Sequence, residues 1–244
     1  MVALYVDMHV HCSELQNIEN YTKSGEIVLV CVSDDYDSSM NTLKLAEKYD
    51  KLEACIGVHP WVAHEYSASS IRSLLDTAIS KYDVKCLGEV GLDKRFKADT
   101  FEKQLEIFNV VVEYAREYGL VLNLHAADAW REVFEIVSSK DIEKAYFHWY
   151  TGPLDLMELI QSSGYFIGVN PAWMLQQKHR VVLEQARIEH IITESDAPYN
   201  YRGLQLVPDM VKKTVEYITL TRKLNIEQVR KVIYGNYSRL FGKL

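Results

Sequence analysis

The chain has 244 residues, 48% of them hydrophobic, a formal net charge of −7 and a sequence pI of about 5.6. This length is sufficient for one sizeable core, and the acidic balance argues against a protein that holds long nucleic acid on a basic surface. A nuclease whose bound metal ions supply the positive charge is not excluded.

The cysteines and the start of the chain indicate the compartment. Cys12, Cys31, Cys55 and Cys86 form no CxxC pair, and each lies in or beside an apolar run. We therefore expect reduced thiols that fill a core, as in a cytosolic protein. The first residues lack the basic and apolar regions of a signal peptide, and no apolar run reaches the roughly 18 residues of a membrane span. We expect a cytoplasmic protein.

Short β-branched runs alternate with helical segments along the whole chain. They are near-continuous apolar runs, which is typical of parallel strands covered on both faces. The predicted strands are 2–11, 26–33, 53–59, 84–92, 121–125, 144–148, 164–169 and 190–196.

The clearest helical pattern lies between the fourth and fifth strands. Thr100 is placed to cap it and Gly119 to end it. Further helical patterns cover 70–81, 130–140, 154–162, 209–224 and 226–240. Eight strand–helix alternations without a long linker predict an α/β fold, a closed (β/α)8 TIM barrel that forms one domain over 1–244. An open doubly wound sheet is the alternative.

Metal-competent side chains fall at the ends of these strands, where such a barrel carries its chemistry. His9 and His11 share one face of the first strand, because alternate residues of a strand point the same way. Burying so many polar groups without partners would cost several kcal/mol, which a metal ion offsets. The residues in question are His9, His11, His59, Glu89, Asp93, His125, His148 and Asp196.

The donor set suggests two divalent ions. A carboxylate can bridge two metal ions roughly 3.5–4 Å apart, and Glu89 is suited to do so. One ion would then be held by His9, His11, Glu89 and Asp196, and the second by Glu89, His125 and His148. Mixed nitrogen and oxygen ligands suit Zn²⁺ or Mn²⁺, whereas Mg²⁺ prefers oxygen.

Seven motifs occur in order along nearly the whole chain. They are D-x-H-x-H at 7–11, G-x-H-P at 57–60, G-E-[IV]-G-L-D at 88–93, F-x-x-Q-L at 101–105, H-x-[FY]-[ST]-G at 148–152, E-[TS]-D-[AS]-P at 194–198 and N-x-x-R-L-F-G at 236–242. With these motifs the chain resembles the TatD family of metal-dependent deoxyribonucleases, within the amidohydrolase-like barrels.

The resemblance implies a (β/α)8 barrel that hydrolyses phosphodiesters, typically DNA, with a metal-activated water. It implies metal ligands at His9, His11, Glu89, His125, His148 and Asp196. It also implies that Glu89 and Asp196 are catalytic, with Asp196 taking the proton of the attacking water, and that His59 lies near the phosphate, where it would stabilise negative charge if protonated. Cys12, Trp61 and Ala127 depart from the family pattern, and these departures spare the ligands but affect positions near substrate.

Several residues are candidates for substrate contact or support. Arg202 is a candidate phosphate ligand, with a solvated surface arginine as the alternative. Trp61, Trp149 and Tyr150 are candidates for stacking on a base or sugar, although such residues more often cover a core. Asp7 and Glu194 are expected either to bond a ligand histidine or to form buried ion pairs, with Lys85 as a candidate partner.

Two rival functions stay open at this point. Related barrels hydrolyse other esters, lactones or amides, and many use a modified lysine on the fourth strand, where this chain has Glu89. A non-catalytic barrel kept for binding is the other alternative. The expected substrate is DNA or a short oligonucleotide; no membrane association is expected, and no protein partner is indicated.

Overall fold

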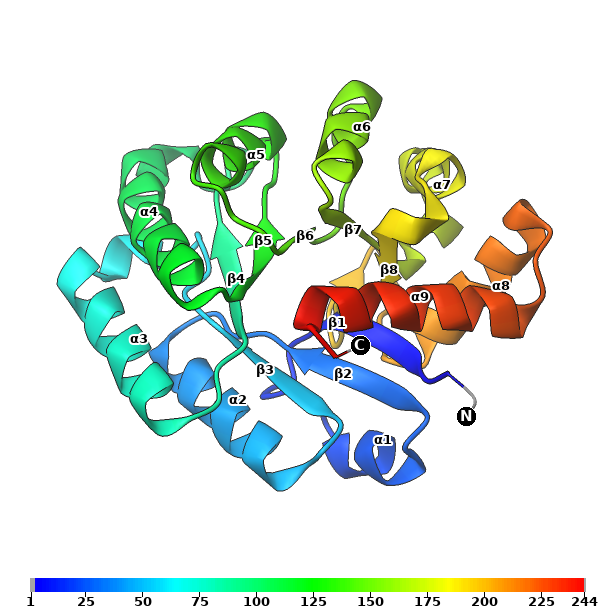
Figure 1. The fold of residues 1–244 in the computed structure, drawn as a ribbon, viewed down its shortest axis with the longest axis horizontal. Helices are drawn as coiled ribbons and strands as arrows, with labels where there is room; N and C mark the ends of the chain where they lie inside the picture. The colour runs from blue at the N-terminus through cyan, green and yellow to red at the C-terminus, as the bar shows by residue number, and fades with distance from the viewer. Residues whose placement is uncertain (1–2, 244) are drawn as a thin grey trace.

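The computed structural model describes residues 3–243 and contains eight parallel strands arranged in chain order in one sheet (Figure 1). The proposed start of the first strand at Val2 lies outside the described residues. The strands are β1 (Tyr5–Val10), β2 (Ile27–Cys31), β3 (Leu52–Ile56), β4 (Cys86–Gly91), β5 (Val121–His125), β6 (Ala145–Phe147), β7 (Phe166–Val169) and β8 (Ile191–Thr193).

The sheet curves round until its two edges meet. Val10, the last residue of β1, forms a parallel bridge with Ala197. The His11 amide donates to the Ala197 carbonyl and the Asp196 amide donates to the His9 carbonyl, both at 2.9 Å. The predicted barrel is therefore confirmed, and the open sheet is not formed.

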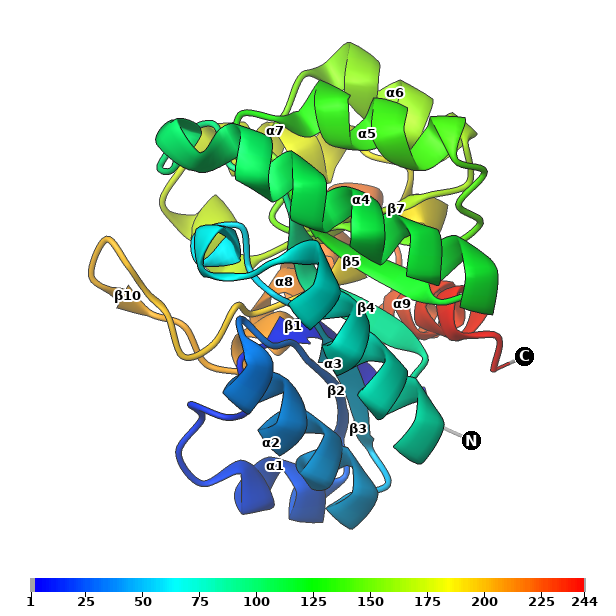
Figure 2. The ribbon, with the colours of Figure 1, turned by 90° about the vertical axis from the view of Figure 1, so that its left-hand side faces the viewer.

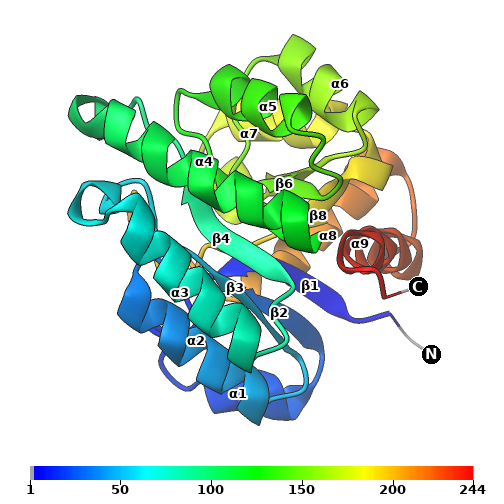
Figure 3. The ribbon, with the colours of Figure 1, turned by 60° about the vertical axis from the view of Figure 1, so that its left-hand side comes forward.

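Helices surround the strands on the outside (Figures 1 and 3). Each of the first seven follows the strand of the same number, and the last two follow β8. They are α1 (Ile18–Ser24), α2 (Tyr36–Lys48), α3 (Ala68–Lys81), α4 (Phe101–Tyr118), α5 (Trp130–Ser139), α6 (Leu154–Ser162), α7 (Gln177–Gln185), α8 (Met210–Arg222) and α9 (Ile226–Phe241).

Helices α1 and α2 were not predicted from the sequence, and the reason is physical. Helix α1 buries none of its residues, and two of the three residues that α2 buries, Ser39 and Thr42, are polar, so few buried apolar residues mark either helix in the sequence. The strongly periodic α4 begins and ends as predicted: Gly119 takes the left-handed conformation, with φ of 63°. Thr100 is the N-cap residue, but its side chain accepts no capping bond.

The cysteines form two disulfides, Cys12–Cys31 and Cys55–Cys86, so the prediction of reduced thiols is wrong. Cys55 and Cys86 are direct register partners in the parallel strands β3 and β4. Cys31 pairs with Val10, which places Cys12 just beyond the same strand pair. Such cross-strand neighbours depend on sheet register, which a spacing rule along the chain does not reveal.

A short hairpin follows β8 and projects beyond the barrel (Figure 2). It consists of β9 (Asn200–Tyr201) and β10 (Leu204–Gln205), joined by a turn that contains Arg202 and Gly203. Helix α8 starts after it. Within residues 3–243, none of the helices combines the length and apolar character needed to cross a bilayer.

Candidate metal centre

Glu89 lies in the middle of a cluster at the carboxyl ends of the strands. This end of the barrel is called the mouth below. Its carboxylate is 3% exposed. Oε1 lies 2.6 Å from His125 Nδ1 and 3.4 Å from His59 Nε2, whereas Oε2 lies 3.1 Å from His9 Nε2 and 3.8 Å from His11 Nε2. Both oxygens therefore face imidazole nitrogens from different strands.

Asp196 faces the same space from the end of β8. Its Oδ1 lies 3.4 Å from His11 Nε2, 3.7 Å from His9 Nε2 and 4.0 Å from His148 Nε2. Among the ion pairs of residues 3–243, Glu89 and Asp196 pair with histidines alone. Two buried carboxylates without a lysine or arginine partner form an environment that suits a cation.

Four histidines are each held by an oxygen through one ring nitrogen, which leaves the other nitrogen facing the cluster. Such outer bonds fix the ring orientation of metal-binding histidines. The pairs are His9 Nδ1 with Asn123 Oδ1 at 3.0 Å, His11 Nδ1 with Asp34 Oδ2 at 3.0 Å, His148 Nδ1 with Glu194 Oε2 at 2.9 Å and His125 Nε2 with Asp93 Oδ2 at 2.9 Å.

The charges of the cluster shift several pKa values. Burial alone would raise the pKa of Glu89, but the charges of His59 and His9 and the bond from His125 hold it well below its usual value. Burial likewise opposes ionisation of His125, yet its bonds to Asp93 and Glu89 raise its pKa to about 9. Carboxylates and imidazoles thus stabilise each other's charged forms in the absence of metal.

The pKa values of Asp93 and His148 are also shifted in the direction that favours the charged form. Burial would raise the pKa of Asp93, but the bonds from His125, the Phe96 amide and Trp61 lower it to about 2. Against the effect of burial, Glu194 raises the pKa of His148. A bound metal ion would displace a proton from the ring nitrogen that faces Glu89, whereas the protons shared with Asp93 and Glu194 would remain.

The donor atoms fall into compact groups. Within each group the atoms lie within 4.8 Å of one another, and the buried nitrogen and oxygen donors fit divalent transition metals. His148 groups with His9 rather than with His125, which groups with His59. The groups are His9–His11–Asp196, His9–Glu89–His148, His59–Glu89–His125 and His11–Asp34–Glu89.

Two glycines leave room for this arrangement. Gly91 has φ of 143°, and a Cβ there would lie 2.0 Å from the His125 carbonyl oxygen. A Cβ at Gly168, on β7, would lie 2.4 Å from Glu194 Oε2. A side chain at either position would displace a residue of the cluster or one that orients it.

His59 and Trp61 lie at the mouth, as their motif predicted. His59 Nδ1 accepts from the Trp61 amide at 3.2 Å, and burial lowers the pKa of His59, with the charge of Glu89 acting in the opposite direction. The Trp61 indole donates to Asp93 Oδ2 at 2.6 Å, and the side chain is 41% exposed.

The two other aromatic candidates, Trp149 and Tyr150, lie in different environments. Trp149 is half-buried, and its ring lies 5.9 Å from that of His148 and 5.1 Å from that of Tyr201, between centroids. Tyr150 is 1% exposed and its hydroxyl donates to the Pro153 carbonyl at 2.6 Å, so it belongs to the core rather than to a stacking surface.

Arg202 lies in the turn of the β9–β10 hairpin and is exposed. The Gln176 carbonyl oxygen accepts from Arg202 Nη1 and Nε at 3.1 Å and from the Tyr201 hydroxyl at 2.6 Å, in the amide orientation that satisfies these groups. The guanidinium is thus held against the start of α7.

Asp7 and Glu194 each bond a predicted ligand histidine, Asp7 at the backbone and Glu194 at the ring. Asp7 Oδ1 accepts from the Ser195 amide at 2.7 Å and from the His9 amide at 3.4 Å, while Lys85 pairs with Asp83 instead. Glu194 holds His148 and also accepts from Tyr146 and from the Trp149 amide. Through its bond to the Ser195 amide, Asp7 connects β1 to the segment after β8, below the mouth.

Sequence reasoning missed Asp34, Asn123 and Asn170. Asp34 follows β2 directly, Asn123 lies on β5 two residues before His125 and so shares its face, and Asn170 follows β7 and donates to Glu194 Oε1 at 3.3 Å. The available signal was their position near strand ends. Asp34 and Asn170 follow strands that carry no predicted ligand, and Asn123 lies one layer below the predicted ligand His125.

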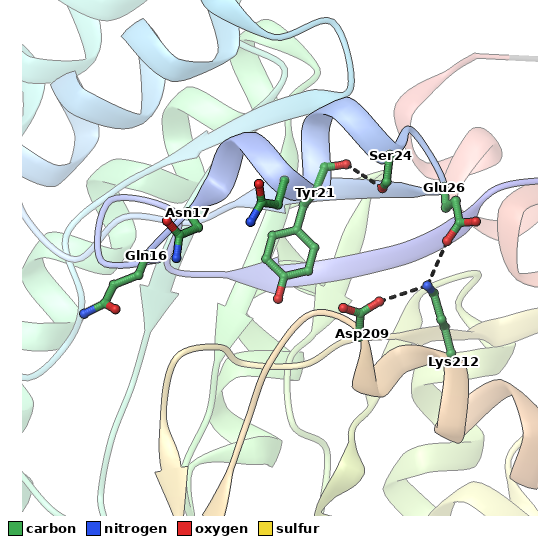
Figure 4. Close-up of a pocket in the computed structure, with 8 residues that line it drawn as sticks. Gln16, Asn17, Tyr21, Ser24, Glu26, Asp209 and Lys212 are labelled. Atoms are coloured by element: carbon green, nitrogen blue, oxygen red, sulfur yellow. Dashed lines mark hydrogen bonds and ion pairs between the residues drawn. The ribbon is translucent and has the colours of Figure 1, made fainter.

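A separate polar pocket of about 300 Å³ lies between α1 and the start of α8 (Figure 4). Lys212 Nζ there bonds Glu26 Oε2 at 2.8 Å and Asp209 Oδ1 at 2.9 Å. Its charged groups are already paired, and none of its lining residues belongs to the cluster around Glu89.

A parallel eight-stranded barrel with buried imidazoles and carboxylates at its mouth defines the class of metal-dependent barrel hydrolases. The family model described as TatD related DNase matches residues 6–242. The chain therefore belongs to the TatD family, and the resemblance inferred from its seven motifs is confirmed.

Named relatives cover nearly the full chain. An uncharacterized metal-dependent hydrolase of Methanocaldococcus jannaschii is 26% identical over 249 residues, covering 98% of this chain and 97% of the relative. The human deoxyribonuclease TATDN3 is 26% identical over 261 residues, covering 98% and 95%. The crystal structure of the TatD homologue YJJV from Escherichia coli matches with a TM-score of 0.87 at 21% identity, covering 99% of each chain, which shows the shared fold.

Proposed function

We propose that this protein hydrolyses phosphodiester bonds in DNA or short oligonucleotides with two divalent metal ions at the mouth. The observation that carries the proposal is the buried carboxylate of Glu89, whose two oxygens each face imidazole nitrogens. Family membership supports metal-dependent hydrolysis, and the relatives named as deoxyribonucleases favour a nucleic acid substrate.

The proposed ligands are the six predicted residues, with Glu89 as the bridge. His9, His11 and Asp196 would hold one ion together with Glu89, and His125 and His148 would hold the second. His148 groups with His9 and Glu89, whereas His125 groups with His59 and Glu89, so both groups contain the carboxylate proposed to hold both ions. We propose Zn²⁺ or Mn²⁺, because nitrogen donors predominate; Mg²⁺ would bind less tightly.

The protein residues have separable tasks in the proposed reaction. Bound metal ions would supply Lewis acidity that makes water reactive near neutral pH. Asp196 would orient the attacking water and accept its proton at Oδ1. His59, whose Nδ1 accepts from the Trp61 amide, would donate from Nε2 to a phosphoryl oxygen as negative charge develops there.

The exposed aromatic side chains at the mouth suit a substrate with planar bases. Trp61 is held by Asp93 at its indole nitrogen and is 41% exposed, and its ring lies nearly perpendicular to those of His59, at 5.1 Å, and Phe96, at 5.7 Å. We propose that Trp61 and Trp149 stack on nucleobases that flank the scissile phosphate.

The decisive experiment joins metal analysis to cleavage of a labelled oligonucleotide, for wild type, Glu89→Ala and the control Glu143→Ala. Glu143 is exposed and lies outside the cluster. We expect two equivalents of metal and turnover for wild type and the control, and loss of both for Glu89→Ala. Full activity of Glu89→Ala would contradict the proposal. Hydrolysis of a lactone or carboxylic ester in preference to bis(p-nitrophenyl) phosphate would favour a different hydrolase.

The proposed location is the cytoplasm, as the sequence predicts. The two disulfides are more typical of oxidising compartments, so the redox state of the cysteines in cells tests this proposal directly.

A further inference from the structure

His179, in the first turn of α7, is a buried imidazole without an assigned task. It is 6% exposed, and its Nε2 has no hydrogen-bond partner within residues 3–243. Its ring lies edge-on to Trp149 at 5.8 Å and to Tyr201 at 6.2 Å, between centroids. A buried polar atom without a partner costs free energy, so its retention here indicates a ligand.

Arg202 is joined to the start of α7 through Gln176, next to the helix turn that carries Lys178 and His179. Lys178 is within electrostatic reach of Arg95, from the loop after β4, and of Arg202, from the hairpin. Asp128 is the acidic group that also acts on Lys178. Burial and the charges of Arg95 and Arg202 lower the pKa of Lys178, and the charge of Asp128 acts in the opposite direction, so the cations here outnumber the acidic group.

The position of these groups is defined by contacts on both sides. Arg202 is held through Gln176, which immediately precedes α7, and the Arg95 amide donates to Asp93 Oδ1 at 2.8 Å. Trp149 connects the cations to the cluster around Glu89, because its amide donates to Glu194 Oε1 at 2.8 Å while its ring contacts His148 and Tyr201.

We propose that Arg95, Lys178 and Arg202, together with His179 and the rings of Trp149 and Tyr201, form a subsite for a second phosphate and its nucleobase. This inference rests on the proposed function, since the second phosphate belongs to the nucleotide next to the scissile bond. The cations bind the phosphate, the rings stack on the base, and His179 Nε2 bonds a polar edge of that nucleotide. A local cationic site also explains how a chain of net charge −7 holds a polyanion.

The test compares a substrate with one phosphate and a substrate with several. The variant Lys178→Ala/Arg202→Ala removes two cations of the subsite. The control Lys81→Ala/Lys140→Ala removes two exposed cations from the last residue of α3 and the position after α5, at the opposite end of the barrel. Each protein is assayed with bis(p-nitrophenyl) phosphate and with labelled hexathymidylate.

We expect the subsite variant to lose at least about tenfold in kcat/KM for hexathymidylate, mainly through KM, and less than twofold for bis(p-nitrophenyl) phosphate. Binding of hydrolysis-resistant phosphorothioate hexathymidylate, followed by fluorescence anisotropy, should weaken, and the slope of log Kd against log salt should fall by about 0.7 for each lost phosphate contact. The control should match wild type.

Equal losses on both substrates would overturn the inference, because the cations would then act at the scissile phosphate. Unchanged anisotropy would also overturn it. If wild type hydrolyses neither substrate, the proposed function fails, whereas the anisotropy comparison still decides whether the subsite binds a nucleotide chain.

Discussion

Individual side chains at the mouth are oriented by partners that themselves never face the centre of the cluster. Asn123, Asp34, Glu194 and Asp93 each occupy one nitrogen of a histidine and so select which nitrogen remains free. Glu194 makes several further contacts, since it also bonds Tyr146, Asn170 and the Trp149 amide. Replacing Glu194 should therefore disturb the orientation of the His148 ring while the protein still folds.

Replacing Glu194 by Gln should lower metal affinity about 10- to 100-fold, the usual cost of removing an outer partner of a ligand histidine. Competition with a chromophoric chelator measures it. Tyr146→Phe is the matched control, because it removes one bond to Glu194 but keeps the carboxylate on His148, and it should have a smaller effect. Wild-type metal affinity in Glu194→Gln would show that this bond does not orient the ring.

His179 should make the stability of the protein pH-dependent. Burial and the charge of Lys178 lower the pKa of His179 to about 4, whereas Glu194 acts in the opposite direction. The unfolded chain, with a histidine pKa of about 6.5, then binds more protons between pH 4 and 6.5. The stabilisation is therefore complete above about pH 6.5 and is lost as pH falls towards 4, by about 3 kcal/mol.

The variant His179→Phe isolates this effect, because phenylalanine keeps an aromatic ring among Trp149 and Tyr201 but cannot titrate. Urea unfolding of both proteins in EDTA should show that the stability difference between wild type and variant changes between pH 7 and 4, to the disadvantage of wild type at low pH. A pH-independent difference would contradict the lowered pKa.

At the level of single elements, the loops between strand and helix do the positioning, and helix caps hold the loops. The segment after β2 is an example. Asp35 caps α2: its carboxylate accepts from the Ser38 amide at 2.7 Å, while Ser38 Oγ accepts from the amides of Asp34 and Asp35 at 3.0 Å. The same turn therefore starts the helix and places Asp34 beside His11.

Removing this cap with Asp35→Ala should destabilise the protein by about 1 kcal/mol. For a chain of this size the loss corresponds to a fall in Tm of roughly 2–4 °C, measurable by thermal unfolding followed by circular dichroism. Asp35→Asn should retain most of the stability, because an amide oxygen also accepts from the Ser38 amide. Equal destabilisation by Asn and Ala would show that the side chain acts in some other way.

Across the whole molecule, the two disulfides join neighbouring strands within the first half of the barrel. Cys12–Cys31 closes a sequence separation of 19 residues and Cys55–Cys86 one of 31. Constraint of the unfolded chain by loops of these lengths is worth about 3 kcal/mol for each bridge. The strands they join, β1 to β4, contribute His9 and Glu89 to the cluster.

Protein unfolded without reductant should therefore show no titratable thiol, and Cys55→Ala/Cys86→Ala should be less stable than wild type by about 3 kcal/mol in denaturant unfolding. Reduction of the disulfides should also lower the free energy of unfolding of wild type. Four free thiols for each unfolded chain, one for each cysteine in the sequence, would contradict the bridges.

The order of the strands, the barrel and the residues at the mouth could be predicted from local pattern alone. Parallel strands covered on both faces are apolar along their length, and an alternating strand–helix rhythm leaves few topologies. Polar residues such as His9, Glu89 and Asp196 interrupt that apolar pattern at strand ends, so their position along the chain already indicated their position in space.

Contacts between distant segments could not be obtained in this way. The pairing of Cys55 with Cys86, the grouping of His148 with His9, the bond of Asp7 to the Ser195 amide and the attachment of Arg202 to Gln176 all depend on strand register and on loop paths. A repeat of two or of 3.6 residues records which face of its own element a side chain occupies. It carries no information about which atom of another element meets that face, since this depends on how the barrel closes.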